Sequence, residues 1–149
     1  MSGGLFKVDQ EPAATGMESS GSIAGLKVMV IDDSRTIRRS AETLLKNEGC
    51  EVITANDGFE ALAKITDYQP NIIFVDIMMP RLDGYQTCSL IRNAEDTRNT
   101  PVVMLSSSDG IFDIAKGQAR GATAHVTKIP PDSVLRELIF NHTQKKAAA

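Results

Sequence analysis

Polar side chains that can take part in chemistry directly follow four of the apolar runs in this sequence. They are the pair Asp32 and Asp33, then Asp76, Ser106 and Lys128. If the apolar runs form parallel strands, their carboxyl ends share one edge of the sheet, which is where ligands bind in open α/β folds. We therefore expect the carboxylates, the hydroxyl and the ammonium group to converge at that edge.

The acidic residues among them predict a metal site. Neighbouring strand ends would bring Asp32, Asp33 and Asp76 side by side, where a proton or a cation must relieve their repulsion. A small set of oxygen ligands that is open to water suits Mg²⁺. Asp32 and Asp33 alone could equally cap the helix that follows them. Asp76 has no such explanation, because Ile77 follows it and no helix is expected to begin there.

Short apolar runs alternate with amphipathic stretches of helical length along most of the chain. The apolar runs span residues 27–31, 51–54, 71–75, 102–105 and 124–127. Ser34 is a suitable N-cap for the first helix, and Gly49 is a suitable stop. This alternation is typical of a parallel sheet that helices cover on both faces. We predict an α/β fold, a doubly wound five-stranded parallel sheet in the order 2-1-3-4-5 with five helices.

The chain of 149 residues has the length of one domain. Residues 1–25 are rich in Gly, Ser, Ala and Glu and show no sustained helical or strand period, so we expect a flexible N-terminal extension. Residues 26–143 form the predicted domain, and residues 144–149 form a short C-terminal tail. Since we expect no output domain after Thr143, the domain should deliver its effect by binding another molecule.

Composition argues against several classes of function. Hydrophobic residues make up 42% of the chain and charged residues 23%, which is an ordinary globular mix. The net charge of −3 does not provide the basic surface that binds a phosphate backbone, so we expect no nucleic-acid partner. No apolar run approaches the about 20 residues of a membrane span and no secretion signal is evident, so we expect a cytoplasmic protein without membrane insertion. Cys50 and Cys88 lie far apart and are expected to be small buried hydrophobic residues.

Several short segments together resemble the receiver domains of bacterial two-component response regulators. They are residues 30–34 (VIDDS), 74–80 (FVDIMMP), 83–84 (DG), 104–107 (MLSS) and 126–128 (VTK). The resemblance covers residues 26–143. It is greatest to the stand-alone receivers of chemotaxis and of the type IV pilus chemosensory systems that control twitching motility. It implies the flavodoxin-like receiver fold.

The resemblance also implies the chemistry of the acidic residues. Asp76 would be the phosphoacceptor, phosphorylated by a partner histidine kinase. Mg²⁺ would be bound directly by Asp33 and Asp76, and through a water molecule by Asp32. The main-chain carbonyl of Met78 would be a further ligand.

The remaining residues of the pattern would read out the phosphorylation. By resemblance, Ser106 would be the switch hydroxyl and Lys128 would pair with the phosphoryl group. His125 stands where the family has an aromatic switch residue on the fifth strand. The output would be reversible binding of a downstream motility or pilus-associated protein by a monomeric response regulator.

Other functions remain open at this stage. The family normally has proline directly after the lysine, whereas Ile129 follows Lys128 here, so a receiver that acts without phosphorylation is one alternative. A Mg²⁺-dependent phosphatase or phosphotransferase of the haloacid dehalogenase type also uses an aspartate nucleophile, but places it after the first strand in an Asp-x-Asp arrangement that is absent here. A flavodoxin-like cofactor carrier is disfavoured, because no Gly-rich or Ser/Thr-rich phosphate loop follows the first strand.

Overall fold

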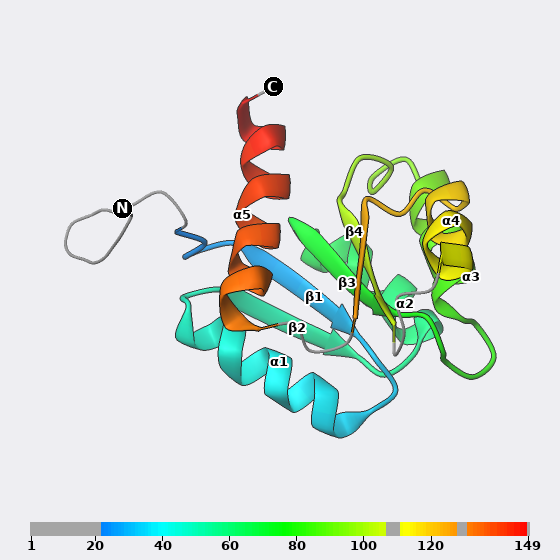
Figure 1. The fold of residues 1–149 in the computed structure, drawn as a ribbon, viewed down its shortest axis with the longest axis horizontal. Helices are drawn as coiled ribbons and strands as arrows, with labels where there is room; N and C mark the ends of the chain where they lie inside the picture. The colour runs from blue at the N-terminus through cyan, green and yellow to red at the C-terminus, as the bar shows by residue number, and fades with distance from the viewer. Residues whose placement is uncertain (1–21, 107–110, 128–130, 149) are drawn as a thin grey trace.

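The computed structural model of the chain describes residues 22–106, 111–127 and 131–148 (Figure 1). Lys128 and Ile129, the latter in the position where the family normally has proline, lie outside the described residues. Residues 1–21 of the expected N-terminal extension lie outside them as well. Among the helices within these ranges, none is long and apolar enough to cross a membrane.

Five parallel strands form one sheet in the order β2-β1-β3-β4-β5. Their bounds are Lys27–Ile31 for β1, Glu51–Ala55 for β2, Ile72–Asp76 for β3, Val102–Ser106 for β4 and Ala124–Thr127 for β5. Every residue of β3 and β4 is buried, as the continuous apolar runs of a sheet covered on both faces require. The predicted fold class and strand order are therefore confirmed.

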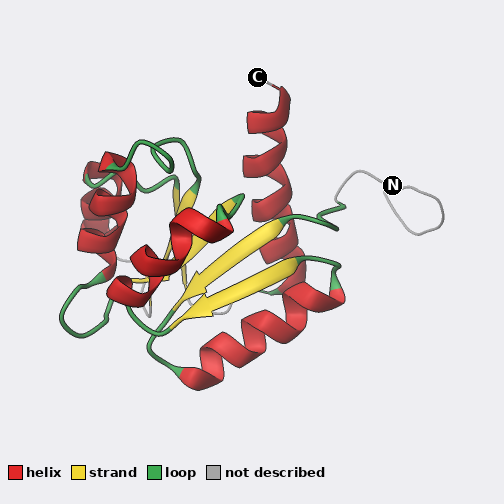
Figure 2. Cartoon of the chain, turned by 180° about the vertical axis from the view of Figure 1, so that it is seen from behind, coloured by secondary structure: helices red, strands yellow, loops and turns green. Residues whose placement is uncertain are grey.

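The helices lie on both faces of this sheet (Figure 2). Their bounds are Arg35–Asn47 for α1, Gly58–Tyr68 for α2, Gly84–Asn93 for α3, Ile111–Ala119 for α4 and Asp132–Ala148 for α5. One core cluster joins the sheet to α2 and α3, and a second joins the opposite face to α1 and α5. The sheet thus holds the loops after β1 and β3 side by side at its carboxyl edge, because these two strands are neighbours.

The core includes a residue that precedes the expected start of the domain. Ile23 is 1% exposed and belongs to the cluster beneath α1 and α5. The amide of Gly25 donates to the main-chain oxygen of Gly49 at 2.9 Å, and the Cys50 thiol donates to that of Ile23 at 3.4 Å. The chain is therefore packed against the domain from at least Ile23, three positions before residue 26.

Both cysteines are buried and free of disulfide bonds, as the sequence predicted. Burial raises the pKa of the Cys50 thiol to about 11, and the nearby Glu48 carboxylate adds to this shift. Burial is also the main cause that raises the pKa of Cys88. Since the reactive form of cysteine is the thiolate, both residues act as packing groups at neutral pH.

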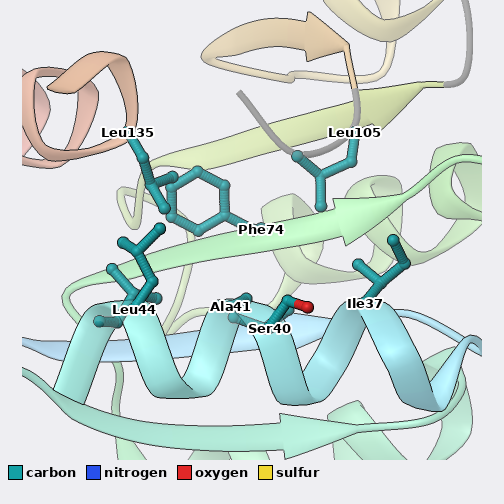
Figure 3. Close-up of a pocket in the computed structure, with 9 residues that line it drawn as sticks. Ile37, Ser40, Ala41, Leu44, Phe74, Leu105 and Leu135 are labelled. Atoms are coloured by element: carbon teal, nitrogen blue, oxygen red, sulfur yellow. The ribbon is translucent and has the colours of Figure 1, made fainter. Parts of the chain in front are cut away.

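An apolar cavity of about 60 Å³ lies between α1, the sheet and α5. Side chains of α1 face those of the strands and α5 across it, and the labelled ones in Figure 3 are Ile37, Ser40, Ala41, Leu44, Phe74, Leu105 and Leu135. None of the three aspartates lines it. Ligand pockets measure about 300–1,000 Å³, so this cavity is a packing gap and the chemistry lies elsewhere.

Candidate metal and phosphoacceptor site

Asp32, Asp33 and Asp76 come together at the carboxyl edge of the sheet. Asp32 and Asp33 directly follow β1, and Asp76 is the last residue of the neighbouring strand β3. One carboxylate oxygen from each lies within 4.8 Å of the others. We expected the third apolar run to end at Val75, but the ladder to β4 continues through Asp76, which pairs with Leu105.

Two of these three neighbouring carboxylates are buried, where repulsion between negative charges is poorly screened by water. Asp32 is 0% exposed and Asp76 is 1% exposed, whereas Asp33 is exposed to solvent. Like charges at this separation destabilise one another, and a bound cation relieves that repulsion. The donor set consists of oxygen atoms and one of its members reaches water, which is the combination that Mg²⁺ binds. The residues present therefore fit the metal that the sequence predicted.

The amide of Asp32 donates to the main-chain oxygen of Ala55 on β2 at 3.0 Å, and the other hydrogen bonds described for the loop after β1 join residues close in sequence. One carboxylate oxygen of Asp32 accepts from the amide of Ser34 at 2.9 Å, and the Ser34 hydroxyl accepts from the amide of Ile37 at 3.3 Å. Arg38 donates to the main-chain oxygen of Asp32 at 2.7 Å. Ser34 is thus the N-cap of α1, as predicted, and it orients Asp32 at the same time.

The loop after β3 is longer and returns to its own starting point. The amide of Gly84, at the start of α3, donates to the main-chain oxygen of Ile77 at 2.9 Å. The amide of Met78 donates to a carboxylate oxygen of Asp76 at 3.3 Å, so the loop orients this carboxylate directly. Between these two points, Arg81 has a positive φ of 66°, which costs a residue other than glycine of order 1–2 kcal/mol.

Glycines allow this loop to pack tightly against its neighbours. A Cβ on Gly84 would meet the main-chain oxygen of Asp76 at 2.4 Å and the Cα of Ile77 at 2.8 Å. A Cβ on Gly58, the first residue of α2, would meet the side chains of Thr87 and Leu82. The start of α3 therefore lies directly against Asp76, and the start of α2 lies against the loop.

Of the other sequence-predicted residues, the structure describes Ser106, His125 and Met78. Ser106 is the last residue of β4 and is 4% exposed. His125 lies on β5 opposite Met104 and is half-buried, on the sheet face that carries α2 and α3. The Met78 side chain is 73% exposed, so this residue contributes to the site through its main chain. Lys128 lies outside the described residues.

Sequence reasoning missed a contact between Arg81, in the loop after β3, and Asp57. Arg81 forms an ion pair with Asp57, which is 24 positions earlier and is the N-cap of α2. The Asn56-Asp57-Gly58 segment has the composition of a turn and predicts a helix start. Nothing in that signal connects it to residue 81, because the contact depends on how α2 and the loop pack.

Comparison with known proteins agrees with this geometry. Residues 28–140 match the family model described as the response regulator receiver domain. The chain is 71% identical over 104 residues to Protein PilG of Pseudomonas aeruginosa, an alignment that covers 70% of this chain and 77% of that protein. It is 41% identical over 102 residues to the probable transcriptional regulator ycf27 of Cyanophora paradoxa, covering 68% of this chain but only 41% of that protein.

Solved structures show the same fold. The chemotaxis protein CheY4 of Vibrio cholerae superimposes with a TM-score of 0.73 at 34% identity, covering 77% of this chain and 97% of that one. The receiver domain of the Francisella response regulator 1452 gives a TM-score of 0.74 at 30% identity, covering 82% of this chain and 99% of that one. With its family match, its sequence relatives and its sheet order in agreement, the chain belongs to the response regulator receiver-domain family.

Proposed function

We propose that this protein is a response regulator that a histidine kinase phosphorylates on Asp76, and that phosphorylation changes which protein it binds. The observation that carries this proposal is the convergence of three aspartates from two neighbouring strands, with Asp76 at the end of the central buried strand. The acidic group is built into the sheet edge rather than scattered over the surface. Phosphoryl transfer to a carboxylate needs such a fixed, metal-competent position.

In the proposed reaction, the Asp76 carboxylate attacks the phosphorus of a phosphohistidine. A carboxylate oxygen–phosphorus bond forms, the nitrogen–phosphorus bond of the donor breaks, and the electron pair returns to the donor imidazole. Asp33 and Asp76 would hold Mg²⁺ directly, with Asp32 contributing through water and Met78 through its carbonyl. When bound, Mg²⁺ would screen the repulsion between the anionic nucleophile and the anionic donor.

Readout of the phosphoryl group would fall to residues on β4 and β5. The new group brings close to two negative charges and three strong acceptors. Ser106 is buried at the end of β4, the strand next to Asp76, from where its hydroxyl would donate to one of these acceptors. Lys128 would supply a positive charge, and His125 would repack as the switch residue of β5.

The pathway belongs to this proposal as well. The 71% identity to Protein PilG and the structural likeness to the chemotaxis protein CheY4 favour pilus or motility control. We therefore propose a cytoplasmic, monomeric switch whose partners are a histidine kinase and a downstream motility or pilus-associated protein. It would catalyse only its own phosphorylation and slow dephosphorylation.

Incubation with a small acyl-phosphate donor tests the proposal without the kinase. We expect intact mass spectrometry to show one added phosphoryl group in the presence of Mg²⁺ and none in the presence of EDTA. Asp76→Asn should not gain the group. A wild-type protein that stays unmodified would contradict the proposal and favour a phosphorylation-independent receiver, whereas sustained turnover of phosphate esters would favour the phosphatase alternative.

A further inference from the structure

We propose that Arg81 is a positioning residue for the metal site, through a clasp that its side chain forms with Asp57 and Phe59 of α2. We call these three residues the Arg81 clasp. The inference rests on the proposed function, because the site that the clasp would position is the Mg²⁺ site around Asp76. Arg81 itself is not among the metal ligands or the reacting groups.

The clasp spans from the loop after β3 to the beginning of α2. The Arg81 guanidinium is hydrogen-bonded and ion-paired to the Asp57 carboxylate. The same guanidinium lies over the Phe59 ring, 4.9 Å from the ring centroid. Asp57 is held in turn, because its other carboxylate oxygen accepts from the amide of Glu60 at 2.8 Å. Arg81 therefore binds to a part of α2 that is itself fixed.

The backbone conformation at Arg81 is strained for a residue other than glycine, which indicates that its side-chain contacts stabilise the loop. The amide of Leu82 donates to the main-chain oxygen of Pro80 at 2.7 Å, which closes a three-residue turn centred on Arg81 at a φ of 66°. Turns of this kind with a positive φ are rare and strained. Glycine would adopt this conformation at no steric cost, but only a long cationic side chain can reach both Asp57 and Phe59.

The clasp restrains the middle of the loop after β3. Both ends of this loop are fixed close to Asp76. The hydrogen bond between Gly84 and Ile77 closes the base of the loop, and Leu82 packs where a Gly58 side chain would otherwise be. Met78 lies between Ile77 and Arg81 in this loop, and its amide donates to the Asp76 carboxylate. Holding the middle of the loop therefore limits the rotation of the main chain that would offer the Met78 carbonyl to Mg²⁺.

The charge state of the clasp is suited to this purpose. The hydrogen bond from the Glu60 amide is the largest cause that lowers the pKa of Asp57, and the hydrogen bond and charge of Arg81 lower it further. Asp57 is therefore ionised at neutral pH. The guanidinium consequently keeps an anionic partner under the conditions in which the site would bind Mg²⁺.

Mg²⁺ titration of variants by isothermal calorimetry tests the inference. We expect Arg81→Gly, which suits the turn but removes the clasp, to raise the Mg²⁺ dissociation constant about tenfold, as loss of groups that orient metal ligands commonly does. Asp57→Asn keeps a good helix cap and should raise it by a smaller factor. The double variant should bind no more weakly than Arg81→Gly alone, because one interaction is lost in both.

Lys46→Met is the matched control. It breaks an exposed ion pair with Glu42 on α1, at 2.9 Å, that touches neither site loop, so the dissociation constant should not change. Urea unfolding of each variant in EDTA separates positioning from stability. An unchanged dissociation constant for Arg81→Gly would overturn the inference, as would losses of affinity that simply add in the double variant.

The two proposals fail in different ways. A wild-type protein that binds Mg²⁺ but accepts no phosphoryl group would contradict the proposed function and leave the titration a valid test of the clasp. A phosphorylated wild-type protein with an unchanged Arg81→Gly titration would contradict the clasp alone. A wild-type protein that does not bind Mg²⁺ would overturn both.

Discussion

The loops that follow β1 and β3 bring carboxylates to the same point by different means. After β1, the Asp32 carboxylate accepts from Ser34 and its main-chain oxygen accepts from Arg38, contacts within six positions, while the Asp32 amide donates to the main-chain oxygen of Ala55 on β2 at 3.0 Å. After β3, contacts with α2 hold the loop, such as the pair of Arg81 and Asp57. Gly84 also brings the start of α3 against the backbone of Asp76.

This difference predicts which substitutions the loop after β1 and the loop after β3 should each tolerate. A locally capped loop forms together with its helix, so damage to the cap should reduce helix stability before it moves the carboxylate. A loop held by distant elements depends on packing, so a small steric change should displace it. The following substitutions test this distinction.

The largest effect is expected at Gly84, in the loop after β3. We predict that Gly84→Ala lowers the free energy of unfolding by about 3 kcal/mol, because its new Cβ would overlap backbone atoms of Asp76 and Ile77 that cannot move independently. Urea denaturation followed by circular dichroism measures this loss. Mg²⁺ affinity should fall as well.

Gly117→Ala provides the control for this substitution. Its Cβ would meet the nearest atom, in the Met104 side chain, at 3.4 Å, and it lies within α4. We expect the stability to be unchanged or to rise by up to about 1 kcal/mol, because alanine favours helix more than glycine does. Equal losses for the two variants would show that Gly84 is not a specific close contact.

A smaller effect is expected at Ser34, in the loop after β1. We predict that Ser34→Ala lowers the free energy of unfolding by about 1 kcal/mol, since the hydroxyl that accepts from Ile37 is lost. The bond from the Ser34 amide to Asp32 is retained, so the Mg²⁺ dissociation constant should change little. Ser34→Thr should restore most of the stability. A large loss of affinity in Ser34→Ala would remove the distinction between the two loops.

The smallest effect concerns the pH dependence of stability at Asp57. The Glu60 amide and then Arg81 lower the pKa of this carboxyl below its ordinary value of 3.8 in the folded protein. The stabilisation that ionised Asp57 contributes to the folded protein is therefore fully present above its pKa in the unfolded chain. It is lost as pH falls through its lower pKa in the folded protein. We predict that wild type melts at a higher temperature than Asp57→Asn at pH 6, and that this difference shrinks as pH falls below 3.8. A difference that stays constant down to the most acidic pH would contradict this assignment.

The sequence predicts the main architecture because apolar runs and caps act locally. The apolar run predicted at residues 71–75 forms the buried strand β3, one position later at Ile72–Asp76, and Ser34 caps α1 as the pattern indicates. The convergence of Asp32, Asp33 and Asp76 follows from the predicted strand order, which makes β1 and β3 neighbours, together with the shared edge of parallel strands.

Packing between distant elements explains what the sequence could not predict. The burial of Ile23 depends on space left beneath α1 and α5, and its surroundings in sequence have the composition of a flexible segment. The Arg81 clasp depends on α2 lying next to the loop after β3. Neither feature has a periodicity or a motif that marks it.

Locating the phosphoryl group tests the central claim most directly. After incubation with Mg²⁺ and an acyl-phosphate donor, borohydride would reduce a phosphorylated aspartate to homoserine, which peptide mass spectrometry identifies by position. We predict homoserine at position 76 and at neither position 32 nor position 33. Homoserine at either of those positions, or at none, would contradict the assignment of Asp76 as the phosphoacceptor.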